Sequence, residues 1–359
     1  MNFYIGGEFG ISTDLFLQSV VAQDKRPYGR EYHLYTDTGR SAIYIALQEI
    51  IRRGGAKVAW LPRYCCESVI LPFRLLEFTI NFYSMGKNLE SPDRLPASMA
   101  SATFLFIHYF GRKNYTVMNW LKALLPKDRP LFIIEDCVQA ALNGNIGNYG
   151  DFAIASYRKF LPQPDGALLA CDVPISDEML SESDENFVSE RLIAKIVREG
   201  GGKSEIFLEL LAMAEERIHN VIIPRKMSLL SCFLFHRIDL EEVKRLRKAN
   251  WEYLSGTLKA ESLSNEKLLP LYEAMEEDEI PLGFPILLNK SIRDDFRQFL
   301  TSHSIFCPVH WAHREEYGES DWGCERELSA SMLTLPIDQR LAEPALDYMI
   351  DKIKIFLKR

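Results

Sequence analysis

Three short stretches carry side chains whose types and positions suggest chemistry. The run "IIEDCVQAAL" ends an apolar, β-branched segment in Glu135 and Asp136. The segment "SYRK" places Ser156 and Lys159 at the end of another apolar run, and "TGRS" begins an amphipathic pattern with small hydroxyl and glycine residues. Ligands of open α/β sheets bind beyond the carboxyl ends of the strands. The three stretches are therefore candidates for parts of one site.

The three stretches offer complementary chemistry. A helix amino terminus has free N–H groups and a positive dipole end, so Gly39, Arg40 and Ser41 are suited to holding a phosphate. The acid Asp136 can pair with a protonated ring nitrogen, and Lys159 can form a Schiff base with an aldehyde. Pyridoxal 5'-phosphate (PLP) needs a phosphate cradle, an acid and a lysine together. The combination predicts PLP as the cofactor.

Each stretch also has an ordinary structural explanation. Asp136 can cap the segment that follows it, and Lys159 can be a solvated lysine in a connection. The "TGRS" start can be a simple helix cap. The order of the three stretches, and their positions on successive elements, favour the cofactor over these separate explanations.

The surrounding pattern predicts an α/β fold. The segments "KVAWLP", "FTINFYS", "TFLFIHYF", "PLFIIED", "GDFAIASY" and "GALLAC" are apolar throughout and predict strands. Helical periodicity marks "DTGRSAIYIALQEIIRRGG", "TVMNWLKALL" and "CCESVILPFRLL", where Pro72 is expected to interrupt or end the helix. Such alternation indicates a mostly parallel central sheet covered on both faces. We expect a large domain with an N-terminal arm over residues 1–238.

The order of elements changes after about residue 240. A strand "GFPILL", a helix "SIRDDFRQFLTSH", a strand "IFCPVHW" and a closing helix "AEPALDYMIDKIKIFL" are expected there. This order predicts a smaller C-terminal α+β domain over residues 239–359.

Composition limits the classes of function and partner. The net charge of −8 argues against broad binding to nucleic acid, which needs a concentrated basic surface. The seven cysteines show no paired C-x-x-C metal spacing, so reduced thiols in the cytoplasm are expected and no metal site is predicted. No apolar run approaches the roughly 20 residues that span a membrane. We expect a soluble cytoplasmic protein whose partners are small molecules.

The sequence resembles the sugar aminotransferases of the DegT/DnrJ/StrS group, which are PLP-dependent enzymes of fold type I. The resemblance extends from "TGRSAIYIAL" through "IIEDCVQA" and "GDFAIASYRKF" to "IFCPVHW" and "LSASMLTLPID". The stretch "EDCVQA" is similar to the family signature E-D-x-A-Q-A. The resemblance implies that Asp136 contacts the pyridine nitrogen and that Gln139 lies near the ring hydroxyl. Glu135 is then a structural neighbour.

The same resemblance assigns the phosphate site and the lysine. "GDFAIASYRK" is similar to the family pattern G-D-F-x-x-x-S, which implies that Ser156 reaches the phosphate and that Lys159 binds the cofactor aldehyde. "TGRS" corresponds to the family's S-G-T-x-A helix start. This places Gly39, Arg40 and Ser41 against the same phosphate.

Further residues are candidates for the walls of the site. The family has an aromatic side chain that stacks on the cofactor near "PRYCCES", and Tyr64 is either that residue or a core tyrosine. His108 and His310 are candidates for the substrate site, although His108 ends an apolar strand and is also suited to a hydrogen-bonded core position. Arg112 is either an anion ligand or a solvated side chain.

The sequence departs from the family pattern in three places. Ser156 and Lys159 are three positions apart, whereas the family usually has five, and the shorter spacing occurs in other fold-type-I aminotransferases. The glycine-rich stretch after the lysine is replaced by "FLPQPDGALL". Pro224 stands where the family carries an asparagine that reaches the phosphate of the neighbouring subunit. Either Arg225 or Lys226 substitutes for it, or this contact is lost.

The resemblance implies a homodimeric aminotransferase. It would move an amino group from an amino acid, glutamate in the family, to a keto group of a nucleotide-linked deoxysugar. Relatives that perform dehydration have histidine at the position of Lys159, so the lysine favours transamination. The alternative is a non-catalytic PLP-binding or regulatory protein. Pro224 and the missing glycine run support it, whereas the retained Asp136, Gln139, Ser156 and Lys159 oppose it. A nicotinamide-dependent oxidoreductase would need G-x-G-x-x-G between a strand and a helix, which the sequence lacks.

Overall fold

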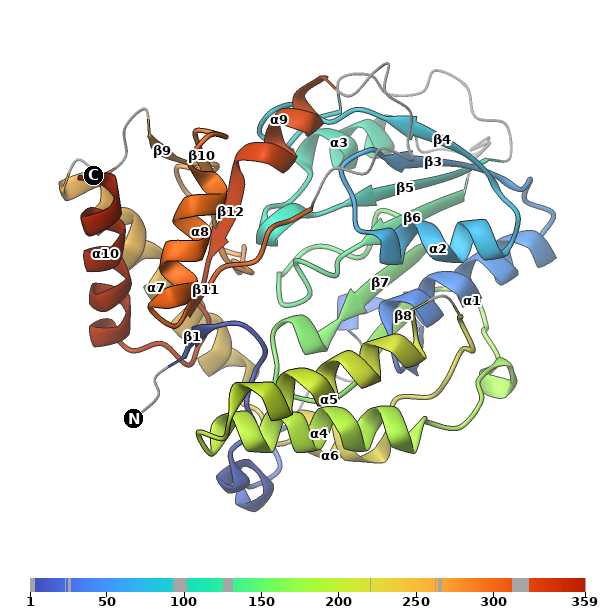
Figure 1. Ribbon diagram of the computed structural model, residues 1–359. Coiled ribbons are helices and arrows are strands. Elements are labelled where there is room, and N and C mark those ends of the chain that lie inside the picture. The colour runs from blue at the N-terminus through green and yellow to red at the C-terminus, as the bar shows by residue number, and fades with distance from the viewer. Residues whose placement is uncertain are drawn as a thin grey trace.

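The computed structural model describes residues 4–22, 24, 27–92, 102–124, 132–219, 221–261, 263, 267–311 and 323–358. Two parts stand side by side: a large sheet with its helices, and a smaller sheet against which other helices pack (Figure 1). The division at residues 238 and 239 stays a prediction. The N-terminal strand lies beside the smaller part, because Ile5 packs into the apolar core formed by residues from Trp251 to Leu357.

The large sheet has seven strands, and it is mostly parallel as the sequence predicts. Neighbouring strands from β4 to β7 run parallel, whereas β8 is antiparallel to both of its neighbours, β7 and β2. Every residue of β5, β7 and β8 is buried, which explains their continuous apolar runs. The strand order is β2 (Tyr32–Thr36), β8 (Ala167–Cys171), β7 (Phe152–Ser156), β6 (Phe132–Asp136), β5 (Thr103–Ile107), β3 (Val58–Pro62) and β4 (Thr79–Tyr83).

Helices surround this sheet. They are α1 (Gly39–Arg52), α2 (Glu67–Leu75), α3 (Tyr115–Leu124), α4 (Glu185–Glu199), α5 (Ser204–Arg217) and α6 (Leu229–Phe235). Helix α1 packs on β2, β7 and β8 because Ile43, Ala46, Leu47 and Ile50 form one buried apolar face. The expectation for Pro72 is wrong: it lies inside α2, which continues to Leu75.

The smaller part has a three-stranded antiparallel sheet with β10 (Phe284–Leu288) between β9 (Leu268–Pro270) and β12 (Met332–Leu335). Its helices are α7 (Leu240–Ala260), α8 (Arg293–Ser302), α9 (Gly323–Ser331) and α10 (Glu343–Leu357). The predicted strand "IFCPVHW" forms a strand only at β11 (Ile305–Phe306), which pairs in parallel with β1 (Ile5–Gly6). Short 3-10 turns are η1 (Thr13–Leu17), η2 (Pro27–Gly29), η3 (Tyr109–Gly111), η4 (Tyr157–Lys159) and η5 (Asp177–Met179).

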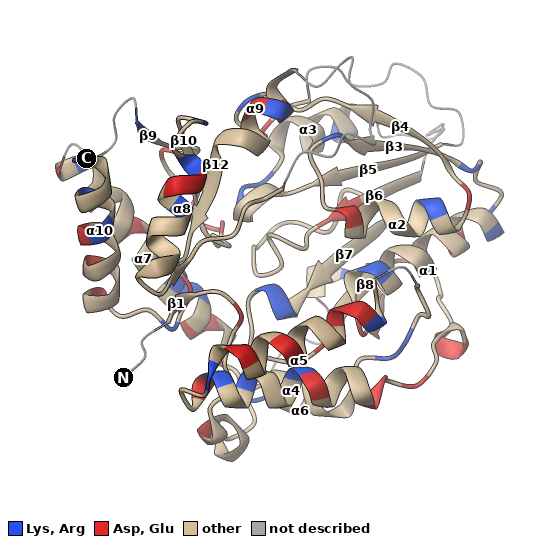
Figure 2. Ribbon diagram, in the orientation of Figure 1, with Lys and Arg blue, Asp and Glu red and all other residues tan. Residues whose placement is uncertain are grey.

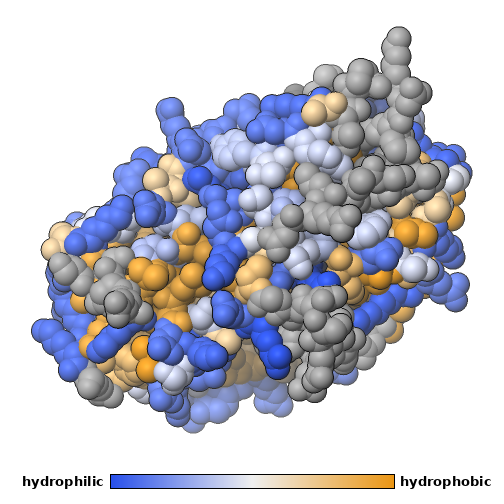
Figure 3. Space-filling model, turned by 90° about the horizontal axis from the view of Figure 1, so that it is seen from above, coloured by the Kyte–Doolittle hydropathy of each residue, from blue (hydrophilic) through white to orange (hydrophobic). Residues whose placement is uncertain are grey.

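The surface mixes both signs of charge. Acidic and basic residues are interspersed along α4 and α5 (Figure 2), and Arg158 of the turn η4 pairs with Glu215 of α5. Seen from above, hydrophilic residues cover much of the molecule and hydrophobic residues gather in separate patches between them (Figure 3). Within the described residues, none of the helices combines the length and the apolar character that crossing a bilayer requires.

Candidate active site

The carboxyl ends of β6 and β7 bring the predicted residues together. Asp136 is the last residue of β6 and Ser156 the last of β7, and Lys159 ends the turn η4 that follows. Because β6 and β7 are adjacent and parallel, their ends lie at one edge of the sheet. A cavity of about 90 Å³ opens there. It is lined by Thr38, Gly39, Arg40, Ile43, Cys66, Ser68, Val69, Ile107, Asp136, Val138, Gln139, Ser156, Arg158, Lys159 and Trp311.

Asp136 is an enclosed carboxyl group, and no cation of the described part of the chain is bonded to it. Its side chain accepts a hydrogen bond from the N–H of Val138 at 2.9 Å, and the residue is 3% exposed. Burial raises the pKa of Asp136 to about 6, against smaller opposing effects of the Val138 amide and of the charges on His108 and Lys159. A cationic N–H placed in the cavity would compensate for this desolvation. The geometry suits a protonated ring nitrogen.

Lys159 lies between two cavities. Its side chain lines the 90 Å³ cavity and also a cavity of about 430 Å³, which Arg158, Arg247, His310 and residues 6–9 of the N-terminal arm help to line. Lys159 is exposed and makes no hydrogen bond to the residues that the structure describes. Its amine is thus available to groups in either cavity.

The first turn of α1 leaves two amide groups for an anion. Thr38 caps the helix, and its hydroxyl oxygen accepts a hydrogen bond from the N–H of Ser41 at 3.3 Å. The N–H groups of Gly39 and Arg40 have no hydrogen-bond partner among the described residues. The side chain of Ser41 points to Thr38, 3.2 Å away, and does not line the cavity. The phosphate-binding groups of this turn are therefore mainly backbone amides.

Gln139 has one side-chain atom committed to the backbone. Its Oε1 accepts a hydrogen bond from the N–H of Phe110 at 2.8 Å, while the residue lines the cavity. This bond holds the side chain at the cavity. A contact with the ring hydroxyl of a cofactor stays a prediction.

Tyr64 is placed behind the cavity. It is 2% exposed, its ring lies 5.4 Å from that of Trp311, and its hydroxyl contacts Met332. Trp311 lines the cavity, whereas Tyr64 does not. The structure thus gives Tyr64 the core position that was the alternative expectation, and Trp311 is the aromatic residue nearest to the site. Sequence reasoning missed Trp311, although it ends the quoted stretch "IFCPVHW".

His108 belongs to a buried structural network and not to either cavity lining. Its side chain has no exposed surface, its Nε2 lies 2.9 Å from Glu135 Oε1, and its Nδ1 accepts a hydrogen bond from the N–H of Asn114 at 3.0 Å. Glu135 also accepts hydrogen bonds from the N–H groups of Gly147, Tyr149 and Gly150. The alternative of a hydrogen-bonded core histidine therefore describes His108, and Glu135 has the structural role expected of it.

His310 lines the larger cavity beside Lys159. Its Nδ1 lies 2.9 Å from Thr334 Oγ1, and its ring packs edge-on against Phe110. Burial, with a smaller contribution from the positive charge of Lys159, lowers the pKa of His310 to about 3. The imidazole is therefore neutral at physiological pH and can exchange hydrogen bonds with a ligand without adding charge.

The residues considered for the cross-subunit contact are bound within the chain. Arg225 donates to the carbonyl oxygen of Glu182 at 3.2 Å and lies 3.6 Å from Asp184. Lys226 lies 3.1 Å from the Glu182 carboxylate. Neither lines the cavity that contains Lys159. Arg112 is likewise paired, with Glu90 and Glu279.

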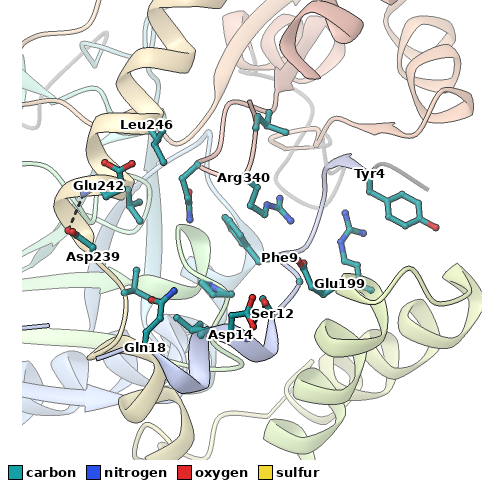
Figure 4. Close-up of a pocket in the computed structure, with 18 residues that line it drawn as sticks. Tyr4, Phe9, Ser12, Asp14, Gln18, Glu199, Asp239, Glu242, Leu246 and Arg340 are labelled. Atoms are coloured by element: carbon teal, nitrogen blue, oxygen red, sulfur yellow. Dashed lines mark hydrogen bonds between the residues drawn. The ribbon is translucent and has the colours of Figure 1, made fainter. Parts of the chain in front are cut away.

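A third cavity of about 710 Å³ has the lining drawn in Figure 4, which includes none of these residues. It is formed by the N-terminal arm, α7 and the segment 339–341, and the guanidinium of Arg340 stacks on Phe9 at 4.2 Å. Its lining contains no lysine, histidine or cysteine. Asp136, Gln139, Ser156 and Lys159 instead line the 90 Å³ cavity, and His310 lines the 430 Å³ cavity.

Solved structures of similar fold were found. A putative sugar aminotransferase, Spr1654 from Streptococcus pneumoniae in its PLP form, has 12% identity and a TM-score of 0.67, with 98% of each chain covered. The chain has the fold of sugar aminotransferases. DesV from S. venezuelae, in complex with a ketimine intermediate, has 18% identity and a TM-score of 0.62 over 92% of this chain and 86% of that chain. NtdA from Bacillus subtilis with bound cofactor PMP has 15% identity and a TM-score of 0.63, with 92% of this chain and 74% of that chain covered.

No family model matches the sequence, and no curated protein matches it significantly. The likeness is therefore one of fold, which confirms the predicted α/β architecture of fold type I. With this aminotransferase fold established, the roles of individual residues rest on the geometry described above.

Proposed function

We propose that this protein is a PLP-dependent aminotransferase. One observation carries the proposal: Asp136 and Lys159, from the ends of adjacent parallel strands, line one cavity at the amino terminus of α1. The groups in that cavity suit the cofactor. Among the residues that the structure describes, no cation pairs with the buried acid Asp136, no group bonds to Lys159, and none accepts from the amides of Gly39 and Arg40.

Different residues would bind different parts of PLP. The first turn of α1 and the hydroxyl of Ser156 would bind the phosphate. Asp136 would bind the ring nitrogen, Gln139 would bind the ring hydroxyl, and Lys159 would bind the aldehyde. PLP, when bound, supplies an electron sink for charge that develops beside the ring. Asp136 would keep the proton on the ring nitrogen. Trp311 lines the cavity and would cover one side of the ring.

Lys159 would hold the cofactor aldehyde and would also move the proton. With its Nζ free, the amine would act as general base toward the Cα proton of an amino donor and would return that proton as a general acid. Lys159 can do both because its side chain lines the cofactor cavity and the larger cavity. His310, neutral and held by Thr334, would offer a hydrogen bond to a substrate in the larger cavity.

The 430 Å³ cavity is the proposed place for the donor and the acceptor, which bind in turn. Glutamate as the donor and a nucleotide-linked deoxysugar as the acceptor follow from the resemblance of the motifs, with the shared fold in support. Three arginines, Arg158, Arg247 and Arg297, line this cavity and suit anionic groups such as a carboxylate or a diphosphate.

We also propose that the protein works as a homodimer in the cytoplasm. Exposed apolar side chains gather on the N-terminal arm and on α6, where Leu17 is 85% and Leu229 is 89% exposed. These segments touch, since Phe16 packs against Phe233 and the N–H of Val21 bonds to the carbonyl of His236. A partner subunit would cover this surface. The seven cysteines form no disulfide, in agreement with a reducing compartment.

The test is the near-visible absorption spectrum of the purified protein with PLP, followed by borohydride reduction and peptide mapping. We expect an absorption band that glutamate bleaches and a reduced adduct on Lys159. The variant Lys159→Ala should bind PLP but lose turnover, whereas the surface control Lys244→Ala should retain both. Full transaminase activity in Lys159→Ala would refute the assignment. A band that no amino donor bleaches would favour a non-catalytic PLP-binding protein, and no band at saturating PLP would discredit the site.

A further inference from the structure

Four basic side chains form a cluster beside the proposed cofactor cavity. Arg40, Arg158 and Arg191 converge on Glu215 of α5, with nitrogen-to-oxygen distances of 3.7, 3.1 and 2.8 Å. Arg191 and Lys195 of α4 also hold Glu8 of the N-terminal arm, at 3.1 and 3.0 Å. The cluster thus joins α1, α4, α5, the turn η4 and the arm.

The cluster has an excess of positive charge. Its four cations face the carboxylates of Glu8 and Glu215, and the neighbouring acid is Asp37, whose pKa burial raises to about 6. Desolvating like charges is costly unless an anion compensates for them. The missing negative charge is expected where the cluster meets a cavity.

Arg158 and Arg40 are the two members of the cluster that line the 90 Å³ cavity. Arg40 donates a hydrogen bond from Nη1 to the carbonyl oxygen of Ile218, and its Nη2 lies 3.7 Å from Glu215 in an ion pair. Arg158 uses only Nη1, which donates to Glu215. Its Nε and Nη2 groups have no hydrogen-bond partner among the described residues. Arg158 therefore retains donors for an anion in the cavity, next to Ser156 and the free amides of α1.

We propose that Arg158 is a ligand of the cofactor phosphate and that Glu215 positions its guanidinium. The inference rests on the proposed function, and it concerns how this chain binds PLP without the cross-subunit asparagine that Pro224 replaces. Arg225 and Lys226 are tied to Glu182 and Asp184, whereas Arg158 supplies its charge from the same chain. A planar guanidinium can donate two parallel hydrogen bonds to a phosphate, which gives both strength and orientation.

The same guanidinium also lines the larger cavity, so a carboxylate of the amino donor is the competing anion. The two anions are distinguished by comparing PLP with pyridoxal, which has the same ring and aldehyde but no phosphate. A phosphate ligand affects PLP alone. If Arg158 instead binds the donor carboxylate, its substitution leaves the binding of PLP and of pyridoxal unchanged. It then raises the glutamate concentration needed to bleach the absorption band.

The experiment titrates cofactor-free protein with PLP and with pyridoxal and follows the near-visible band. For Arg158→Gln we expect the Kd of PLP to rise about 10- to 100-fold, the loss of a charge-assisted hydrogen bond, while the Kd of pyridoxal changes by less than about threefold. Arg158→Lys keeps the positive charge but not the planar guanidinium. Its Kd for PLP should lie between those of the wild-type protein and Arg158→Gln. The exposed control Arg245→Gln should leave both constants unchanged.

Three results would overturn the inference. PLP and pyridoxal weakened equally in Arg158→Gln would show a structural role only. Unchanged PLP binding with a higher glutamate requirement would assign Arg158 to the donor carboxylate. If Arg225→Gln weakens PLP binding selectively and Arg158→Gln does not, the phosphate ligand is Arg225 through a cross-subunit contact. If Arg158→Gln fails to fold, the same two Kd values are measured for Arg158→Lys. A rise in the Kd of PLP without a rise in the Kd of pyridoxal then supports the inference, and equal changes contradict it. Wild-type protein that binds no PLP would instead refute the proposed function.

Discussion

Replacing Asp136 by asparagine should make the cofactor-free protein more stable near pH 8, although it removes the proposed partner of the ring nitrogen. The carboxyl group of Asp136 is enclosed, and within the described ranges its one hydrogen bond is accepted from the Val138 N–H at 2.9 Å. Asparagine has the same shape and keeps an oxygen acceptor for that amide. The substitution therefore removes a buried charge without opening a cavity.

The magnitude follows from the pKa of Asp136, which burial raises from 3.8 to about 6. An acid whose pKa is higher in the folded state holds its proton more tightly there. Its stabilising effect is complete below the unfolded pKa and is lost as the pH rises through the folded pKa. Relative to a protonated Asp136, the ionised group lowers the unfolding free energy of the wild-type protein by about 3 kcal/mol at pH 8 and by about half of that at pH 5. Asp136→Asn should recover this free energy.

The assay is urea unfolding of cofactor-free wild-type and variant protein at pH 5 and pH 8. The variant should gain up to about 3 kcal/mol at pH 8 and clearly less at pH 5. Asp239→Asn is the matched control, because Asp239 caps the exposed amino terminus of α7. Asparagine caps nearly as well there, so the control should change the free energy of unfolding by at most about 1 kcal/mol.

Two results would refute this reasoning. A variant that is equally or less stable than wild type at pH 8 would mean that the carboxylate is compensated by groups other than the cofactor. A gain of the same size at pH 5 and pH 8 would mean that packing, and not charge, is responsible. Either result would contradict the hypothesis that Asp136 is an uncompensated buried acid that binds a cationic group of the cofactor.

Other substitutions test the framework of the site by urea unfolding. Glu135→Gln should cost about 2–4 kcal/mol, because an amide NH₂ would face backbone N–H groups or His108 where a carboxylate now accepts four hydrogen bonds; a loss below about 1 kcal/mol would contradict the network. Gln163→Met should stabilise the protein by about 1–2 kcal/mol, since both polar side-chain atoms of Gln163 are buried without a partner among the described residues, and a loss of stability would reveal a bound water. Gly166→Ala should destabilise it by at least about 2 kcal/mol, because φ is +123° and a Cβ atom would lie 2.5 Å from Gln163 Nε2; an unchanged midpoint would show that this loop relaxes easily.

Local patterns sufficed for much of the fold and for the centre of the site. The continuous apolar runs of β5, β6 and β7 identify buried parallel strands, because polar residues are excluded from both faces of such a sheet. Parallel strands bring their carboxyl ends to one edge. This places Asp136 and Ser156 together without knowledge of any other contact, and Lys159 follows within three residues.

Non-local packing decided the remaining residues. Whether Tyr64 or Trp311 faces the cavity depends on contacts between positions more than 240 residues apart, for which sequence periodicity has no signal. The same holds for the pairing of β1 with β11.

The sequence by itself determined the α/β architecture and the acid, serine and lysine at the strand ends, because burial and strand direction impose local patterns. Only the tertiary structure decided that His108 is enclosed by Glu135 and that Arg158 and Glu215 meet beside the cavity. A charged or polar side chain has the same sequence signature on a solvated surface, in a buried network and at a ligand. What distinguishes these positions is the set of neighbours that folding brings around them.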